Sequence, residues 1–299
     1  MQLKNLSKLV LSLGAVGILA ACDPAATGDE EGTTDGSAVA GEIIVVSRED
    51  GSGTRGAFTE ITGVLAEDEN GEEVDETYIE AVIQNGTEGV LSTVAGDANS
   101  VGYVSLGSLN DTVRGLPIDG VEPTNETVQD GSFPIARNFN IAWGGDIEAV
   151  AQDFIDYILS AEGQEIAAEE GYVEFVSEAA AYAGDGSQSG SISVVGSTSV
   201  TPLMEVLVEE YTALNPDVKI DVTSNGSSAG MTAAMDGTAD IGMASRELKE
   251  EEAAELESTA IAVDGIAVIT NKANTIESLT LDQVRQIFTG EVTEWEEVQ

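Results

Sequence analysis

The sequence predicts an α/β protein with two lobes and mainly parallel sheets. Strand-like and helix-like segments alternate along most of residues 42–299, in two blocks joined by an Ala-, Gly- and Ser-rich stretch at residues 177–190. Such alternation is typical of α/β architecture, because each helix covers the sheet between two parallel strands. The chain has 299 residues, of which 42% are hydrophobic, and is therefore long enough to bury the core of each lobe.

The first 22 residues have the pattern of a secretory signal. Lys4 and Lys8 are followed by an apolar run over residues 9–21, which is too short to span a bilayer comfortably. The run ends in Leu-Ala-Ala-Cys, which resembles the lipobox of bacterial lipoproteins. The resemblance implies that Cys22 carries a lipid anchor at the extracytoplasmic face of the bacterial cell membrane. Cys22 is the only cysteine, so no internal disulfide can form.

Residues 23–41 are predicted to be a flexible, acidic tether, because they are rich in Gly, Thr, Ala, Asp and Glu and lack apolar periodicity. The whole chain is strongly acidic, with a formal net charge of −44 at pH 7. Such a surface repels nucleic acid and anionic lipid, so nucleic acid is not an expected partner. It suits a solvent of high salt or high pH.

In the first block, a strand at residues 43–47 precedes a helix over 53–65, whose Phe58, Ile61 and Leu65 share one face. An acidic loop follows at residues 66–76. Further strands are predicted at residues 78–83, 101–106, 113–118 and 137–143, and a short helix at 85–94. The apolar spacing over residues 147–168 predicts the longest amphipathic helix.

The second block continues the alternation. Strands are predicted at residues 192–195, 218–223, 240–243 and 261–270, and helices at residues 202–214, 229–235, 249–256 and 281–288. Pro202 falls in the first turn of its helix, where a missing N–H costs no hydrogen bond.

Three Gly- and Ser-rich loops each link a predicted strand to a predicted helix. They are loop A (47–55, Ser-Arg-Glu-Asp-Gly-Ser-Gly-Thr-Arg), loop B (196–202, Gly-Ser-Thr-Ser-Val-Thr-Pro) and loop C (225–230, Asn-Gly-Ser-Ser-Ala-Gly). A helix start offers unpaired backbone N–H groups and a favourable partial charge to an anion. One such loop is usually a capped turn, but three of them predict a site that encloses a small anion.

Positive side chains lie close to these loops. Removal of residues 1–22 would leave nine of the eleven Lys and Arg residues, and three of the nine, Arg48, Arg55 and Arg246, lie in or beside the Gly- and Ser-rich segments. The planar fork of Arg48 can bind two oxygens at once, and we expect Asp50 to orient it. The residues therefore predict a site for a tetrahedral oxyanion.

Loop A resembles the signature of the phosphate-binding proteins of ABC phosphate transporters, which are two-lobed, periplasmic-binding-protein-like receptors. Loops B and C are similar to the first and second ligand loops of that family, and loop D (240–246, Asp-Ile-Gly-Met-Ala-Ser-Arg) to the third. Ile287-Phe288-Thr289-Gly290 with Trp295 is similar to a family segment outside the site. The resemblance covers nearly all of residues 42–299. It implies a periplasmic-binding-protein-like fold of type II, capture of inorganic phosphate, and delivery to an ABC transporter permease.

The resemblance also implies the ligand residues. The matching positions are Arg48, Ser52, Gly53, Thr54, Thr198, Ser199, Val200, Ser227, Ser245 and Arg246. In many family members an aspartate in the third loop accepts a proton from hydrogen phosphate and repels sulfate, whereas Ser245 stands there in this chain. Asp264 is the nearest alternative acceptor. A sulfate-like oxyanion therefore stays an alternative ligand.

The order of the segments departs from the family and implies a circular permutation. In the family the loop B segment comes first and the loop A segment follows the Trp segment. Residues 42–180 would then be the family's C-terminal half, 181–190 a linker and 191–299 the N-terminal half. One lobe would span residues 143–265 and the other residues 42–136 with 267–299, with a hinge near 137–143 and 264–267. The chain near residues 41 and 299 would meet within about 20 Å on one lobe; a domain-swapped dimer is the alternative.

Other functions fit the residues less well. The chain has no histidine, which excludes a Ser-His-Asp triad and histidine metal sites. A phosphate-ester hydrolase is the remaining enzymatic alternative, and a surface or adhesive protein would leave the loop arginines without a purpose. A calcium site at residues 68–71 is disfavoured, because Ala66 and Thr77 occupy the end positions of an EF-hand pattern. We expect a binding protein that is not an enzyme and needs no cofactor.

Overall fold

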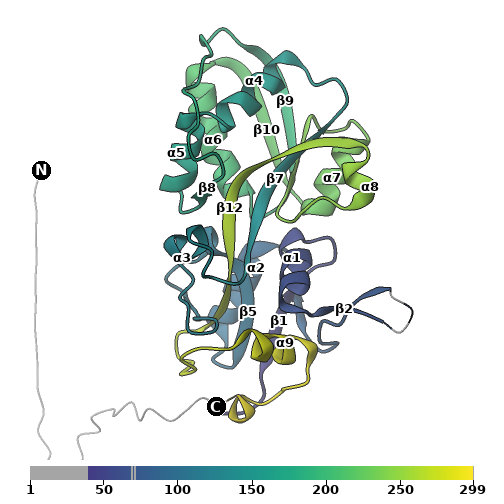
Figure 1. The fold of residues 1–299 in the computed structure, drawn as a ribbon, viewed down its shortest axis with the longest axis vertical. Helices are drawn as coiled ribbons and strands as arrows, with labels where there is room; N and C mark the ends of the chain where they lie inside the picture. Colours follow the sequence, from purple (N-terminus) through teal and green to yellow (C-terminus); the bar gives the residue numbers. More distant parts are fainter. Residues whose placement is uncertain (1–39, 69, 71, 299) are drawn as a thin grey trace, which may run out of the picture. The chain divides into compact units, whose positions relative to one another are not determined.

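The computed structural model describes residues 40–68, 70 and 72–298 (Figure 1). The predicted signal segment, Cys22 and the tether up to residue 39 lie outside these residues. The strands are β1 (Ile44–Arg48), β2 (Leu65–Glu67), β3 (Glu73–Asp75), β4 (Val82–Gln84), β5 (Ser100–Ser105), β6 (Val113–Gly115), β7 (Ala136–Gly144), β8 (Val173–Glu174), β9 (Ser189–Gly196), β10 (Asp217–Ser224), β11 (Ile241–Ala244) and β12 (Leu256–Asn271). The helices are α1 (Gly53–Thr62), α2 (Gly86–Gly96), α3 (Asn125–Gln129), α4 (Ala149–Ile158), α5 (Ala161–Glu169), α6 (Thr201–Leu214), α7 (Ser227–Met235), α8 (Glu250–Ala253) and α9 (Leu281–Thr289), with 3-10 turns at Leu106–Ser108 and Trp295–Glu297. Within the described part of the chain, no helix is long and apolar enough to cross a bilayer.

Two long strands, β7 and β12, connect two sheets. The strand order is β10-β9-β11-β7-β12-β5-β1-β4, and β6 and β8 also pair with β12. β12 pairs with β7 from Leu256 to Gly265 and with β5 from Ile266 to Thr270. Figure 1 shows β7 and β12 running side by side between the two sheets. The crossovers predicted near residues 137–143 and 264–267 lie on these paired strands.

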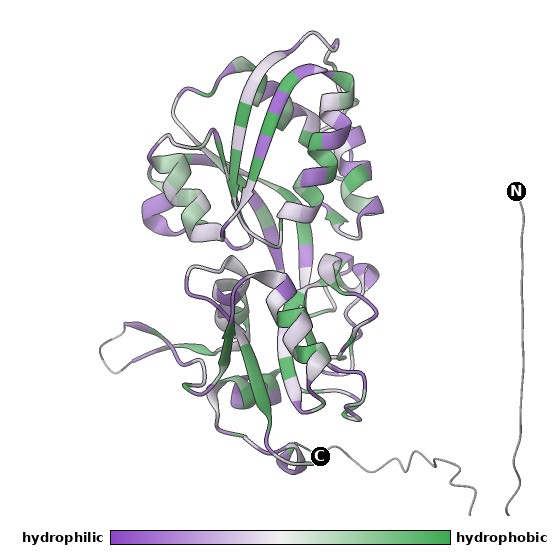
Figure 2. Cartoon of the chain, turned by 180° about the vertical axis from the view of Figure 1, so that it is seen from behind, coloured by the Kyte–Doolittle hydropathy of each residue, from purple (hydrophilic) through white to green (hydrophobic). Residues whose placement is uncertain are grey.

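Each sheet has its own hydrophobic core. The core of lobe I draws on residues 139–262 and that of lobe II on residues 43–135 and 266–298. In lobe I, α4, α5 and α6 pack on one face of the sheet and α7 on the other. In lobe II, α1 and α9 pack on one face and α2 on the other. Figure 2 shows hydrophobic strands and helices that carry hydrophilic residues on part of their surface, as this layering requires.

The expectation of mainly parallel sheets is wrong, because the sheets are mixed. β1 runs parallel to β4 and β5, and β9 parallel to β10 and β11. β7, however, runs antiparallel to β11 and β12, and β12 antiparallel to β5. The physical reason is the path of the chain. β7 leads from lobe II into lobe I and β12 leads back, so the two strands must pair in opposite directions.

Several boundaries differ from those predicted by periodicity. The helix expected over residues 147–168 is broken into α4 and α5, where Ser160 caps α5 by accepting a hydrogen bond from Gly163 N at 3.3 Å. Large apolar residues are missing between Leu159 and Ile166, where the chain reads Ser-Ala-Glu-Gly-Gln-Glu, and this gap was the available signal for the break. The helix expected to reach residue 65 ends at Thr62, because Gly63 takes a left-handed backbone with φ 75°.

Other differences concern strands. The predicted acidic loop at residues 66–76 is largely a hairpin, in which β2 pairs with β3. The strand expected at 78–83 is shorter and later, at β4. β12 starts at Leu256, five residues before the predicted strand at 261–270, which shortens the helix expected at 249–256 to α8. The three segments adopt the extended conformation that pairing with β3, β1 and β7 requires, rather than the structure that their local pattern predicts.

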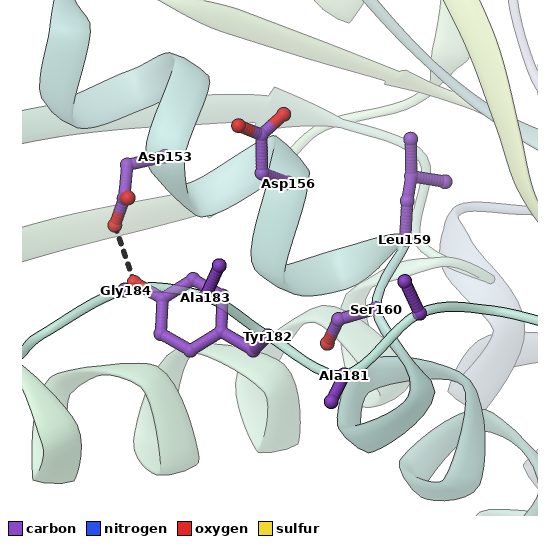
Figure 3. A pocket seen from close by; sticks show the side chains of 9 residues that line it. Asp153, Asp156, Leu159, Ser160, Ala181, Tyr182, Ala183 and Gly184 are labelled. Carbon is purple, nitrogen blue, oxygen red and sulfur yellow. Dashed lines mark hydrogen bonds between the residues drawn. The ribbon is translucent and has the colours of Figure 1, made fainter.

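The stretch at 177–190 includes an anchoring point. The Tyr182 hydroxyl donates to the Asp153 carboxylate, which also accepts from the Tyr211 hydroxyl at 2.8 Å. A cavity of about 360 Å³ lies between α4 and this stretch. Figure 3 shows Tyr182 and Asp153 among the side chains that line it. Ser189 and Gly190 already belong to β9. The linker expected at 181–190 is thus held by an aromatic side chain at one end and by a strand at the other.

The two ends of the described part are neighbours in lobe II. Gly41 N donates to Glu296 Oε2 at 2.9 Å, and Trp295 N donates to the Gly41 carbonyl at 3.0 Å. Trp295 is fully buried and donates from its indole to the Asn99 carbonyl at 3.0 Å. The predicted proximity of residue 41 to the far end of the chain is confirmed as far as residue 296.

This adjacency predicts that the chain tolerates a different pair of ends. A variant that starts at Asp185, joins residue 298 to Gly41 through a short Gly/Ser linker and stops at Gly184 should fold. Its free energy of unfolding should stay within about 3 kcal/mol of the parent, since only surface loop entropy changes. Urea unfolding measures this. A control opened at the buried Leu207 of α6 should not unfold cooperatively, and a non-cooperative Asp185 variant would contradict the prediction.

Candidate functional site

Loop A joins β1 to α1 and places polar groups at the start of a helix. Arg48 is the last residue of β1, and Ser52 is the N-cap of α1, whose Oγ accepts from Arg55 N at 3.3 Å. Gly51 has φ 81°, a conformation that favours glycine. Gly53 and Thr54 are the first residues of the helix, where backbone N–H groups lack an intrahelical acceptor. Loop A therefore presents donors at its tip.

Loops B, C and D are tied together in lobe I. Ser197 Oγ accepts from the backbone N–H groups of Ser199 and Val200 at 3.2 and 3.4 Å, and it donates to Ser245 Oγ at 2.9 Å. Ser227, the first residue of α7, accepts at its Oγ from Ser245 N at 3.1 Å. These bonds bring the N-terminal turns of α6 and α7 to the end of β11. Hydroxyls and helix starts thus gather at one edge of the lobe I sheet.

Loop A of lobe II meets this cluster directly. The Thr54 and Ser199 hydroxyls are hydrogen-bonded at 2.8 Å, and Ser228 N donates to the Gly51 carbonyl at 3.2 Å. A Cβ added at Gly53 would overlap Ser227 Oγ and lie 2.8 Å from Ser245 Oγ. Only glycine leaves room for this approach, because any side chain at position 53 would push the two lobes apart.

Arg48 links both lobes. Its guanidinium, 2% exposed, donates from Nη2 to Thr198 Oγ1 at 2.9 Å and from Nε and Nη2 to the two Glu49 oxygens at 2.7 Å each. Burial raises the pKa of Glu49, but the hydrogen bonds and charge of Arg48, together with backbone N–H donors that include Gly86, lower it by more, so the net pKa lies below its ordinary value. The expectation that Asp50 orients Arg48 is wrong. The Asp50 carboxylate accepts from Gly51 N within the turn, and the longer Glu49 side chain reaches the guanidinium.

The other two loop arginines are also paired with carboxylates. Arg246 binds Glu252 through both terminal nitrogens at 2.7 and 2.8 Å and donates weakly to Ser228 Oγ at 3.4 Å. Burial raises the pKa of Glu252, but the hydrogen bonds and charge of Arg246, together with the backbone N–H and charge of Lys249, lower it by more, so the net shift is downward. Arg55 donates from Nε to Asp75 at 2.8 Å and from Nη1 to the Arg48 carbonyl at 3.1 Å. Arg48 is thus the loop arginine that bonds a hydroxyl of loop B.

Asp264 lies in the crossover between the lobes. Its Oδ2 accepts from Arg137 Nη2 at 2.9 Å, and its Oδ1 accepts from Ser105 Oγ at 2.8 Å and Gly107 N at 3.4 Å. Burial raises the pKa of Asp264, an effect that Arg137 only partly offsets. Among the described residues, its partners come from β5, β7 and the turn after β5, rather than from loops A to D. Asp264 therefore joins the two crossover strands to lobe II.

Sequence inspection missed three polar residues of this region. Glu49 lies inside loop A. Its side chain is longer than that of Asp50, and this was the available signal that it could reach Arg48. Ser197 precedes a helix by the spacing at which a hydroxyl bonds backbone N–H groups, a recognisable local motif. Arg137 stands in an apolar strand, where a buried charge needs a partner. Its partner, Asp264, could not be found without the β7–β12 register.

The assembled groups have the chemistry of an oxyanion cradle. Apart from Ser47, which is bonded to Tyr103, the buried hydroxyls of loop A and of the lobe I loops belong to Ser52, Thr54, Ser197, Ser199, Ser227 and Ser245. Three helix starts and the Arg48 guanidinium add N–H donors, which suit a tetrahedral anion that accepts many hydrogen bonds. In the portion of the chain that the structure describes, no group of three His, Cys, Asp or Glu side chains could hold a metal ion.

Comparison with known proteins shows the family to which this chain belongs. The family model described as PBP superfamily domain matches residues 29–162 and 181–299. Phosphate-binding protein PstS 2 of Streptococcus pneumoniae is 48% identical over 295 residues, which cover 97% of this chain and 99% of the relative. The chain belongs to the PstS family within the PBP superfamily.

Two further members support the assignment. Phosphate-binding protein PstS 2 of Streptococcus agalactiae is 44% identical over 298 residues, covering 99% of this chain and 98% of the relative. The crystal structure of a phosphate ABC transporter, phosphate-binding protein from Streptococcus pneumoniae has a TM-score of 0.70 at 50% identity, covering 87% of this chain and all of that one. The periplasmic-binding-protein-like fold expected from the loops is confirmed.

The Arg246–Glu252 pair predicts a specific loss of stability in acid. Because Arg246 holds the pKa of Glu252 below 4.5, the contribution of the pair is complete above that pH and lost as pH falls through the lowered pKa. Glu252→Gln should therefore cost about 1–3 kcal/mol of unfolding free energy at pH 7 and flatten its decline in acid. Urea unfolding at several pH values measures both. Glu251→Gln, at an exposed neighbour, is the control, and a Glu252→Gln variant with the parent's acid slope would contradict the prediction.

Proposed function

We propose that this chain is a receptor that captures inorganic phosphate between its two lobes and delivers it to an ABC transporter permease. One observation carries the proposal: loop A, with Arg48, meets the hydroxyls and helix starts of loops B, C and D across the lobes. The printed names of its relatives, phosphate-binding proteins and a phosphate ABC transporter component, support the same ligand and role.

We propose that the anion is held by the arginine, hydroxyls and N–H groups at the meeting point of these loops. The residues are Arg48, Ser52, Gly53, Thr54, Thr198, Ser199, Val200, Ser227 and Ser245. Arg246 and Asp264 are not ligands in this proposal. Arg246 is neutralised by Glu252 and supports loops C and D. Asp264 holds the crossover strands through its bond to Arg137.

The surroundings favour short-range capture. A net charge of −44 repels anions at a distance, so binding must rest on hydrogen bonds and on the local charge of Arg48. The same donors suit binding rather than catalysis, because the chain has no histidine to activate a nucleophile. A sulfate-like oxyanion is the competing ligand, and titration separates the two.

We propose further that the mature protein is lipidated at Cys22 and works at the extracytoplasmic face of the bacterial cell membrane. The lipobox-like residues 19–22 support this, and they lie outside the described residues. We also propose that the chain order is a circular permutation of other family members, which the hydrogen bonds of Gly41 to Trp295 and Glu296 support. The Asp185 variant tests the permutation through function, since it should bind phosphate.

Replacing Arg48 should weaken phosphate binding strongly. Arg48→Ala removes a buried, charge-assisted donor, so affinity should fall on the order of a hundredfold, and Arg48→Lys should recover only part of it. Isothermal titration with phosphate and with sulfate measures the effect. Arg285→Ala, at a more exposed arginine on α9, is the control. Parent-like phosphate affinity in Arg48→Ala would overturn the assigned site.

We propose that the two lobes close around the anion when it binds, and Gly53→Ala should impair this closure. The added methyl group would overlap Ser227, so phosphate affinity should drop at least about tenfold, and small-angle scattering should show less contraction on binding than in the parent. Gly56→Ala in the same helix is the matched control. A Cβ there lies 3.4 Å from Arg246 Cδ and slightly favours the helix. Equal affinity of both variants would contradict the close approach at Gly53.

A further inference from the structure

We propose that a pocket between α5 and α6 of lobe I, called here the α5–α6 pocket, is a docking site for a cationic segment of a partner protein. The pocket has a volume of about 610 Å³ and is formed by these two helices together with Tyr157 of α4. α5 packs against α6 on one face of the lobe I sheet (Figure 1). The lining residues lie outside loops A to D, so this surface is separate from the proposed phosphate site.

Helical spacing explains why these side chains share one pocket. Residues three or four positions apart lie on the same face of a helix, and the lining residues of both helices have this spacing. On α6 they are Val206, Glu210 and Leu214. On α5 and at its C-cap they are Glu162, Glu165, Ile166, Glu169 and Glu170. The two faces together therefore present apolar side chains and five carboxylates to the same space.

The pocket also contains a hydroxyl without a partner. Tyr157 is 3% exposed, and its ring packs against Tyr182 and Tyr211. Among the described residues, no hydrogen bond involves the Tyr157 hydroxyl, although the residue lines the pocket. Burial, followed by the charges of Glu210 and Glu162, raises the pKa of Tyr157 to about 12. The hydroxyl therefore lies near carboxylates of both helices, stays neutral at physiological pH, and is free to accept a hydrogen bond from an N–H group.

The carboxylates of the pocket have no positive partner within the described part of the chain. None of the ion pairs found there includes one of them. Glu162 accepts from the backbone N–H of Tyr182 at 2.7 Å, which holds this carboxylate beside the pocket without neutralising it. A metal ion is not the expected occupant, because no group of three His, Cys, Asp or Glu side chains in the described ranges is arranged to hold one. The pocket therefore suits an extended cation.

A lysine or arginine side chain of another protein matches this chemistry. Its aliphatic stem can cover the apolar side chains, of which Leu214 is 49% exposed, while its charged head reaches the carboxylates and the Tyr157 hydroxyl. A second copy of this chain is a poor occupant, because its net charge of −44 has the same sign as the pocket. An anionic membrane surface is repelled for the same reason. The occupant is therefore a protein segment in which Lys or Arg stands beside apolar residues.

The test is the binding of a labelled synthetic peptide, with Leu at helical spacing among Lys residues, measured by fluorescence anisotropy at low ionic strength. A variant with Glu165→Gln, Glu169→Gln and Glu210→Gln removes three charges from the pocket. It should weaken binding at least about tenfold, the combined scale of three surface ion pairs. The matched control has Glu60→Gln, Glu122→Gln and Glu277→Gln, at exposed positions of lobe II, and should keep the affinity within about twofold.

Two single variants test the apolar and hydroxyl groups of the pocket. Tyr157→Phe keeps the ring and removes the hydroxyl, so peptide affinity should fall about threefold or more. Leu214→Ser should weaken binding of the Leu/Lys peptide more than binding of a peptide made of Lys alone. In the parent, the Leu/Lys peptide should slow amide hydrogen exchange in α5 and α6. Phosphate affinity should stay unchanged in all of these variants, which also shows that they fold.

Other outcomes would overturn the docking site. Equal losses in the two triple variants would show only a general attraction of basic peptides to an acidic protein. Spermine that displaces the Leu/Lys peptide and slows exchange in α5 and α6 as strongly would assign the pocket to a small polycation. Parent-like affinity in Leu214→Ser would show that the peptide does not enter the pocket, and this exposed position decides alone if Tyr157→Phe does not fold. A parent that does not bind the peptide would overturn the inference and leave the proposed phosphate binding intact.

Discussion

The antiparallel pairing of β7 with β12 is the constraint on which the rest of the structure depends. Both strands belong to the sheet of lobe I, and β12 continues into the sheet of lobe II by pairing with β5. The buried ion pair between Arg137 of β7 and Asp264 of β12 joins these two strands where they pass between the lobes. Because the pairing fixes the relative position of the two sheets, it also places loop A opposite loops B, C and D.

The site is made of short-range donors in a protein whose overall charge opposes its ligand. Most of its groups are hydroxyls and backbone N–H groups, which carry no net charge and keep their strength beside dense carboxylates. Two of the three loop arginines are neutralised by Glu252 and Asp75. Arg48 keeps both a carboxylate partner, Glu49, and a hydroxyl partner in the other lobe, Thr198. Local geometry, rather than the field of the whole protein, therefore decides what binds.

Glycine and serine serve the site for a shared reason, their small size. Gly53 lets the first turn of α1 lie against Ser227 and Ser245, and Gly230 lets α7 lie against the end of β9. The Ser197 and Ser245 hydroxyls bond each other, the Ser199 hydroxyl bonds Thr54, and the Ser227 hydroxyl accepts from Ser245 N, so these side chains are held in place by the loops themselves. A larger residue at position 53 would separate the lobes, and an apolar residue at position 197 would leave two backbone N–H groups of loop B without their acceptor.

The sequence by itself determined the local chemistry: the strand–loop–helix units, their anion-binding loops and the family they belong to. These follow from short patterns, such as Gly51-Ser52-Gly53-Thr54 before an apolar helix face, that need only neighbouring residues. The tertiary structure alone decided which groups meet. The bond of Arg48 to Thr198 spans 150 residues, and the pairing of Arg137 with Asp264 needs the β7–β12 register. Local patterns record which face of an element is apolar, but partner, register and strand direction arise only when distant segments pack together.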